Sequence, residues 1–220
     1  MSVEDGTDKK IGQIKMKILM INGSPRANGN TVLAFSEMEK IFHKNGIETE
    51  IVRVGSKDIR GCTSCRYCFE HHKCVFDDIV NELAVKFEEC DGMVIGSPVY
   101  HAGVNGTLVS LLNRLFYSTH FDKTMKVGAA VVALRRGGGA SAFDQLNKFF
   151  TVYGMPVASG QYWNSVHGRE VGEAAEDPEG LQAMRTLAEN MSFLVKSIAL
   201  GKEKFGLPEK EERIMTNFVR

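Results

Sequence analysis

The chain has 220 residues, of which 43% are hydrophobic and 25% charged, and its 27 basic and 27 acidic side chains give a formal net charge of zero. This length corresponds to one or two domains and can bury enough apolar surface to fold without disulfides or a metal. Neutrality argues against a protein that coats nucleic acid, because such proteins need a basic excess. Since the chain shows no transmembrane-length apolar run and no apolar signal-peptide core, we expect a cytoplasmic protein that binds neither membrane nor nucleic acid.

Residues 1–14 are polar and are expected to form a flexible N-terminal tail. From residue 15 onward, short apolar runs alternate with segments whose apolar residues recur every three to four positions, which predicts strands followed by helices. The expected strands are 15–23, 49–54, 92–100, a strand with a glycine loop over 126–139, and 155–163. The expected helices are 30–46, 77–91, 104–118, 141–154 and 178–200. Residues 202–220 are expected to form a charged tail or an arm.

This alternation of strands and helices requires βαβ crossovers, which give a parallel sheet with helices on both faces. We therefore predict one doubly wound α/β domain with a five-stranded parallel sheet over residues 15–201, carrying a cysteine-rich loop at 61–76. In such sheets ligands bind where the carboxyl ends of the strands meet the loops. The loops after the first, third and fourth strands are therefore the candidate binding loops.

The loop after the first strand reads GSPRANGNT and leads directly into a helix. The free N–H groups at a helix start favour an anion. Its polar side chains belong to Ser24, Arg26, Asn28, Asn30 and Thr31. The loop matches neither the dinucleotide fingerprint nor the P-loop, and donors concentrated in one turn suit a single terminal phosphate monoester. The alternative is an ordinary helix N-cap, for which the same residue types are favoured.

The loops after the third and fourth strands carry features that suit a flat ring. Pro98 fixes the backbone, Tyr100 and His101 offer flat faces, and Gly103 permits a close approach. Three consecutive glycines at 137–139 expose bare backbone, which indicates a loop that touches a ligand edge. Each loop could also be an ordinary turn, but all three candidate loops belong to the same sheet edge.

GSPR-x-x-GNT after the first strand and GSPVY after the third resemble the flavodoxin-like NADPH-dependent FMN reductases. The cysteine run makes the chain most similar to the iron–sulfur flavoprotein branch of that family. The resemblance covers residues 15–200 and implies a flavodoxin-like sheet of order 2-1-3-4-5, FMN as cofactor and a homodimer or homotetramer.

The resemblance also implies residue roles. The FMN phosphate would be held by Ser24, Arg26, Asn28, Asn30 and Thr31. The flavin ring would lie against Pro98, Val99, Tyr100, His101 and Gly103. A third loop would close over the ring with Arg136, Gly137, Gly138 and Gly139.

The cysteine run has the spacing C-x₂-C-x₂-C-x₅-C and comprises Cys62, Cys65, Cys68 and Cys74. Two-residue spacings let thiolates converge on one inorganic core, and the resemblance implies a [4Fe–4S] cluster. The alternatives are a zinc site, either Cys₄ or Cys₃His with His71 or His72, and four free or redox-active thiols. Cys90 stands alone and is expected to pack in the core.

These observations lead us to expect an FMN-dependent oxidoreductase. It would take electrons from NAD(P)H or a ferredoxin-type donor and pass them to a small acceptor such as a quinone, flavin, azo or nitro compound. Tyr100 and His101 would shape the ring face, and His101 could assist proton delivery. Arg114 is expected to form an ion pair or lie at an interface. The alternatives are a non-enzymatic flavodoxin-like electron carrier and a zinc-stapled flavin-binding regulatory module.

Overall fold

The computed structural model describes residues 15–216 and 218, so the tail predicted at 1–14 lies outside the described residues. Its sheet has six strands in the order β2-β1-β3-β5-β6, with the short β4 paired antiparallel to β3. The strands are β1 (Met16–Asn22), β2 (Ile47–Arg53), β3 (Gly92–Tyr100), β4 (Gly103–Val104), β5 (Val127–Leu134) and β6 (Ser165–His167). The doubly wound parallel sheet and its flavodoxin-like order are confirmed.

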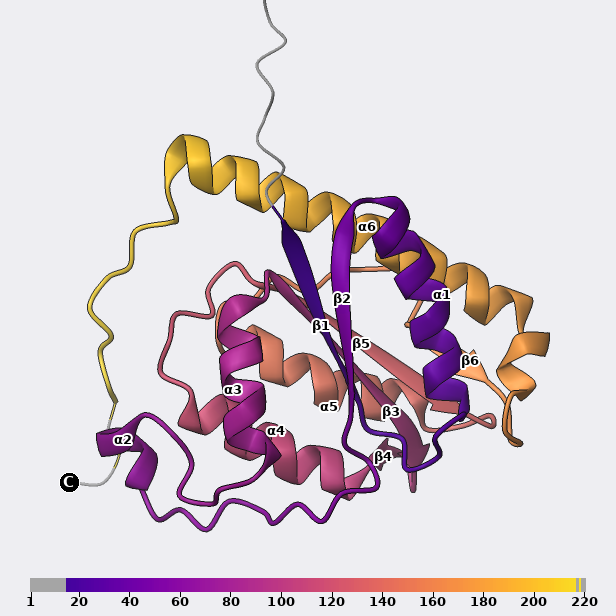
Figure 1. Ribbon diagram of the computed structural model, residues 1–220, viewed down its shortest axis with the longest axis horizontal. Coiled ribbons are helices and arrows are strands. Elements are labelled where there is room, and N and C mark those ends of the chain that lie inside the picture. The colour runs from indigo at the N-terminus through magenta and orange to yellow at the C-terminus, as the bar shows by residue number, and fades with distance from the viewer. Residues whose placement is uncertain (1–14, 217, 219–220) are drawn as a thin grey trace, which may run out of the picture.

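Helices cover both faces of the sheet (Figure 1). They are α1 (Asn30–Lys44), α2 (Tyr67–His71), α3 (Ile79–Glu89), α4 (Gly106–Ser118), α5 (Gly139–Thr151) and α6 (Pro178–Phe205), with a short 3₁₀ turn at Glu173–Glu176. Proline stands at the start of α6, where its missing N–H has no cost. Among the described residues, no helix has the length and apolar character that crossing a membrane requires.

Alternation along the strands divides the core into two layers. Leu19 and Ile21 of β1 face a layer that α3, α4 and α5 cover. Ile18 and Met20 of the same strand face the opposite layer, which α1 and α6 cover. Because both faces are buried, the central strands are almost continuously apolar, as the sequence pattern indicated.

The prediction of the last strand was wrong in its position. Residues 155–163 touch the sheet only at a single bridge between Val157 and Gly128, and the strand itself is β6 at Ser165–His167. After Ala158 the chain leaves the sheet, and Tyr162 and Trp163 are exposed. Tyr162 and Trp163, whose residue types favour strands, therefore lie in a surface loop. The strand itself is only 3 residues long.

The register of the strands brings their carboxyl ends together. Asn22 of β1 is paired with Gly96 of β3, and Pro98 of β3 with Ala133 of β5. The first residue of the loop after β1 is fixed to β3, because Gly23 N donates to Gly96 O at 2.8 Å.

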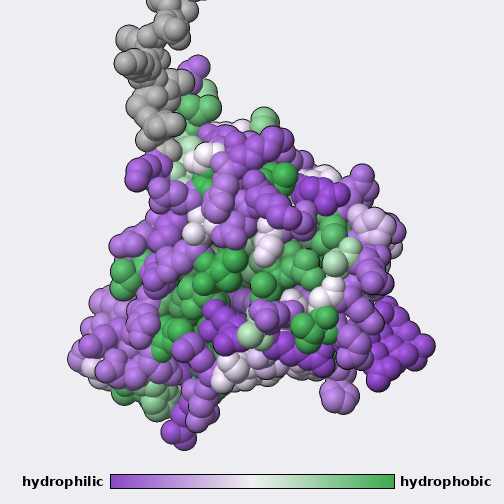
Figure 2. All heavy atoms as spheres, turned by 45° about the vertical axis from the view of Figure 1, so that its right-hand side comes forward, coloured by the Kyte–Doolittle hydropathy of each residue, from purple (hydrophilic) through white to green (hydrophobic). Residues whose placement is uncertain are grey.

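Figure 2 turns the right-hand side of Figure 1 forward, where apolar residues form a band across the middle of the surface, bordered by polar ones.

Candidate functional site

The loop after β1 is held by its own polar groups. Ser24 N donates to Asn22 Oδ1 at 2.8 Å, and Arg26 N donates to Ser24 Oγ at 3.2 Å. α1 then begins after Gly29, which supplies no capping side chain, and the first turn of the helix holds no acidic residue. Neither a capping side chain nor a carboxylate in the first turn therefore offsets the positive end of α1, which suits an anion.

Two buried polar atoms at this loop lack partners. Thr31 is 1% exposed, and its Oγ1 has no hydrogen-bond partner among the described residues; the same is true of Nδ2 of Asn22. An unpaired buried hydroxyl costs free energy unless a ligand satisfies it. Thr31 also lines the pocket beside the loop, so its hydroxyl is placed to meet a bound anion.

That pocket has a volume of about 180 Å³ and carries three arginines, Arg26, Arg135 and Arg169. The remaining lining residues are Ser24, Gly29, Asn30, Thr31, Pro98, Val99, Tyr100, Ala133, Leu134 and Gly168. None of these lining residues is acidic. We call it the phosphate pocket, because its charge and size suit the terminal phosphate of a larger ligand.

The polar atoms of the Asn30 side chain bond to protein backbone, whereas the resemblance implied that they hold a phosphate. Its Nδ2 donates to Glu170 O at 3.1 Å, and its Oδ1 accepts from Gly172 N and Ala174 N at 3.1 and 3.2 Å. The side chain therefore fastens the loop after β6 to the start of α1. This loop brings Gly168 and Arg169 into the phosphate pocket, a contribution that the sequence analysis missed because the last strand was misplaced.

Asn28 is exposed and lies outside the residues that line the phosphate pocket. Arg135, which the sequence analysis did not single out, does line it, whereas its neighbour Arg136 lines a second pocket. Adjacent residues at the end of β5 thus face two different pockets. Sequence reasoning found the segment but not the residue within it.

The loop after β3 meets the phosphate pocket through Pro98, Val99 and Tyr100, and the Tyr100 side chain is 46% exposed. His101 and Ala102 follow with φ of 50° and 60°, in the left-handed region that non-glycine residues avoid. Gly103 then pairs with Tyr100 in the β3–β4 hairpin. The tight turn presents the exposed Tyr100 to the phosphate pocket, whereas His101, also exposed, follows it in the turn and is not among the residues that line the pocket.

The glycine loop after β5 packs against this turn. Gly138 has φ of 85°, and a Cβ there would lie 2.7 Å from Ala102 Cα, so only glycine fits. Gly138 and Gly139 line the second pocket together with Arg136, Tyr162 and Trp163; its volume is about 550 Å³. Gly137 has no neighbour within 4 Å of its Cβ position. The structure thus joins the second and third loops at one point, Gly138 against Ala102.

The four cysteines of the run line one small pocket, which we call the cysteine pocket, together with Arg114 and Tyr117 of α4. Cys62 and Cys65 are exposed, Cys68 is buried in α2, and Cys74 is half-buried. Burial raises the pKa of the Cys68 thiol, and the neighbouring Cys62, Cys65 and Cys74 raise it further. The chain therefore brings these four thiols around one space.

Backbone strain gathers at the two candidate sites. Six non-glycine residues in the described part of the chain have positive φ, and five of them lie in the cysteine loop (Ser64, Arg66, His72) or the loop after β3 (His101, Ala102). Such conformations cost about 1–3 kcal/mol each and persist where the surroundings enforce them. The strain thus marks the same two loops that the sequence motifs mark.

Within the described residues, no group of three or more His, Cys, Asp or Glu side chains is close enough to hold one metal ion. His71 stacks on Tyr67 with ring centroids 3.9 Å apart, and His72 meets His120 edge-on at 4.8 Å. The donor set of the cysteine pocket is nevertheless four thiols, which is the ligand set of a [4Fe–4S] core.

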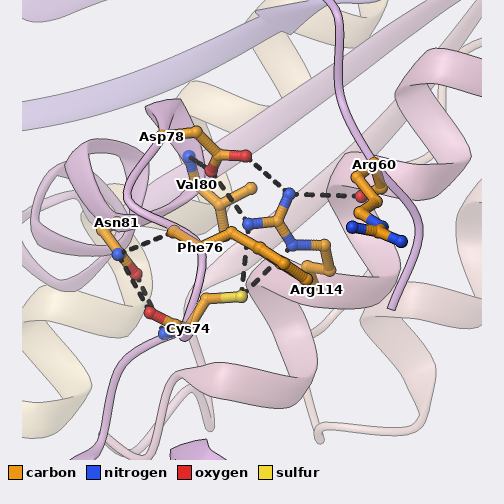
Figure 3. A network of polar contacts seen from close by, with 7 residues as sticks. All are labelled: Arg60, Cys74, Phe76, Asp78, Val80, Asn81 and Arg114. Atoms are coloured by element: carbon orange, nitrogen blue, oxygen red, sulfur yellow. Dashed lines mark hydrogen bonds and ion pairs between the residues drawn. The ribbon is translucent and has the colours of Figure 1, made fainter. Parts of the chain in front are cut away.

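Arg114 forms the expected ion pair, with Asp78 at 2.7 Å. Figure 3 shows that it also reaches Cys74 and the backbone of Arg60. Burial disfavours its charge, but the hydrogen bonds with Asp78 and Cys74 outweigh this and raise the pKa of Arg114. Cys90 is 1% exposed, and burial raises the pKa of its thiol to about 11, which confirms a packing role.

The family profile of NADPH-dependent FMN reductases matches residues 16–170 of this chain. An iron–sulfur flavoprotein of Methanocaldococcus jannaschii is 35% identical over 191 residues, which cover 83% of this chain and 99% of the relative. An iron–sulfur flavoprotein of Methanosarcina thermophila is 28% identical over 199 residues, covering 86% and 100%.

Solved structures show the same fold at low identity. RosB, with a bound 8-demethyl-8-formylriboflavin-5'-phosphate intermediate, superposes with a TM-score of 0.67 at 17% identity and covers 93% of this chain and 94% of RosB. A flavodoxin from the domain Archaea gives a TM-score of 0.55 at 15% identity, covering 82% and 99%. The phosphate pocket, with its arginines and the unpaired Thr31 hydroxyl, fits the phosphate of FMN.

Replacing Thr31 by valine tests the phosphate pocket. Thr31→Val keeps the side-chain shape and removes a hydroxyl that has no partner among the described residues, so the free energy of unfolding without FMN should be unchanged or slightly higher. FMN should bind about tenfold more weakly, or about 1.4 kcal/mol, measured by fluorescence titration.

Ser192→Ala is the matched control, because it removes a buried hydroxyl in α6 that bonds only Ala188 O. Its FMN affinity should equal that of the wild type. Equal affinity of Thr31→Val and the wild type would exclude Thr31 from the phosphate site.

Proposed function

The chain belongs to the NADPH-dependent FMN reductase family, in its iron–sulfur flavoprotein branch, and on that basis we propose that it is an FMN-dependent oxidoreductase with two redox centres. Electrons from NAD(P)H or a ferredoxin-type donor pass through the flavin to a small acceptor such as a quinone, a flavin, or an azo or nitro compound. The observation that carries the proposal is the phosphate pocket, where three arginines and the unpaired Thr31 hydroxyl meet the strained loop after β3.

The residues around the phosphate pocket have separate tasks in this proposal. Ser24, Thr31, Arg26 and Arg169 bind the phosphate, and Tyr100 with His101 shapes the rim where the ring would lie. When bound, the flavin supplies the hydride and electron chemistry, so no side chain need act as a conventional acid or base. His101 is exposed, follows Tyr100 in the turn, and is the candidate to exchange a proton between its imidazole and solvent.

We propose that Cys62, Cys65, Cys68 and Cys74 hold a [4Fe–4S] cluster. The support is that four thiols from both ends of the loop surround one pocket, and that the curated relatives are iron–sulfur flavoproteins. Four thiols are also the ligand set that a [4Fe–4S] core takes.

We further propose that the protein acts as a homodimer or homotetramer. The support is the exposure of large apolar side chains at and after the end of α6. Phe205 is 78% exposed, Ile214 91% and Met215 75%. Exposed side chains of this size are common where a second chain covers them.

Turnover separates the enzyme from the alternative, a flavodoxin-like electron carrier. The FMN-loaded protein is mixed with NADPH without oxygen, and the flavin absorbance should bleach. Adding excess benzoquinone should then give continued NADPH oxidation over many equivalents of protein. Protein mixed with riboflavin, which lacks the phosphate, is the control and should stay inactive.

Bleaching by reduced ferredoxin but not by NADPH would assign a protein donor. A flavin that neither donor bleaches would contradict the proposed enzyme. A flavin that NADPH reduces only once in the presence of quinone would contradict the enzyme and favour the carrier.

Iron content tests the cysteine pocket. Cys68→Ser removes the buried thiol at its base and should lower the bound iron from about four per chain, the count of a [4Fe–4S] core, to about one or none. Cys90→Ser is the matched control, because Cys90 is buried outside the pocket, and it should keep its iron. Equal iron in the Cys68→Ser and wild-type proteins, purified without oxygen, would show that Cys68 is no ligand.

A further inference from the structure

Arg114 is a charged side chain that is almost fully buried. It lies in the middle of α4 and is 1% exposed, and it is among the largest side chains that the fold buries completely. Removing a cation from water costs several kcal/mol unless it is paired and hydrogen-bonded. The partners of this guanidinium therefore show what it contributes to the protein.

All five N–H groups of Arg114 have partners. Nη1 donates to Asp78 Oδ2 at 2.7 Å and to Arg60 O at 3.2 Å. Nη2 donates to Asp78 Oδ1 at 2.9 Å, and Nη2 and Nε both donate to Cys74 Sγ at 3.2 Å. The Phe76 ring lies 5.0 Å from the guanidinium carbon. Two of the five donors thus point at one sulfur atom (Figure 3).

The rest of this network also fixes Cys74. Cys74 N donates to Asn81 Oδ1 at 2.9 Å, and Asn81 Nδ2 donates to Cys74 O at 3.1 Å. Asp78 is itself held, because its Oδ1 accepts from Val80 N at the start of α3. If Arg114 served only to hold α4 against α3, its ion pair with the Asp78 carboxylate would be sufficient. The backbone clamp and the two N–H groups at Sγ hold the thiol itself.

The sulfur atoms of the other cysteines in the pocket have fewer and longer contacts with hydrogen-bonding groups. Cys62 Sγ accepts one backbone N–H, from Ser64 at 3.4 Å, and Cys68 Sγ contacts Tyr117 O at 3.9 Å. Within the described residues, Cys74 is the one cysteine of the four whose sulfur receives hydrogen bonds from a cation. Arg66 also lines the cysteine pocket, but no hydrogen bond joins it to a cysteine sulfur in the described residues, so the hydrogen-bonded cation is the one at Cys74.

We propose that Arg114 is the positioning residue of Cys74 and raises the reduction potential of the iron–sulfur cluster that this thiol binds. The inference rests on the proposed cluster. Reduction adds one electron to the cluster without forming or breaking a bond, so the reduced form carries one more negative charge. Hydrogen bonds and positive charge at a ligating sulfur stabilise that form more than the oxidised form. The Asp78 carboxylate opposes this rise in potential, because its negative charge is paired with the same guanidinium.

The experiment measures the reduction potential of the cluster in the full-length protein by a redox titration followed by electron paramagnetic resonance. Arg114→Gln should shift the midpoint to more negative potential, by a factor of ten or more in the ratio of reduced to oxidised cluster, which is about 59 mV for one electron. Asp78→Asn keeps Arg114 and removes the opposing charge, so the midpoint should shift the other way. Lys17→Gln, which removes a paired cation near the amino end of β1, should leave it unchanged.

A purely structural role of Arg114 would not shift the midpoint potential in opposite directions in the two variants. Unchanged midpoints in iron-loaded Arg114→Gln and Asp78→Asn would overturn the inference and leave the proposed cluster intact. If Arg114→Gln does not load iron, the Asp78→Asn midpoint alone decides: a shift to more positive potential supports the inference, and an unchanged or more negative midpoint overturns it. A wild-type chain that binds no iron would overturn the proposed cluster and this inference together.

Discussion

The close approach of backbone segments at the carboxyl edge of the sheet is the constraint on which the candidate sites depend. A Cβ on Gly55 would lie 2.1 Å from Gly23 O, and one on Gly96 would lie 2.6 Å from the Phe35 ring. A side chain on Gly55 would push the loop after β1 away from the end of β2, and one on Gly96 would push α1 away from β3. The start of α1, and with it Thr31, would then no longer meet Tyr100 across one pocket.

The helix α4 links the two candidate sites. It begins beside the loop after β3, where Asn105 caps it by accepting from Thr107 N at 2.8 Å. Arg114 lies eight residues after Gly106, a distance of about 12 Å along the helix axis. One rigid element thus begins after the β3–β4 hairpin, whose Tyr100 lines the phosphate pocket, and supplies Arg114 and Tyr117 to the wall of the cysteine pocket. A flavin and a cluster held at these places would share a common mechanical support.

The sequence was sufficient for the layers of the fold and for the loops of the site, because both depend on local patterns. Apolar periodicity separated the strands from the helices, and the glycine-rich loop after β1 marked the candidate anion site. The last strand was missed because it has only 3 residues, while the nearby Tyr162 and Trp163 gave a stronger strand signal on the surface. The loop that carries Arg169 was lost with that strand.

The contacts of Cys74 could not have been predicted in this way. Arg114 is 36 residues from Asp78 and 40 from Cys74, and no local pattern joins them. Only the packing of α4 against α3 and the cysteine loop brings them together. Similarly, Arg135 and Arg136 are neighbours in sequence, and only the turn at the end of β5 decides which of them faces the phosphate pocket.

A reductive titration of the protein, purified without oxygen and loaded with FMN, tests the two-centre account most directly. The electrons taken up by each chain are counted from added dithionite. Two centres predict about three electrons per chain, two for the flavin and one for the cluster. An uptake of about two electrons, with only the flavin bands bleached, would contradict the account.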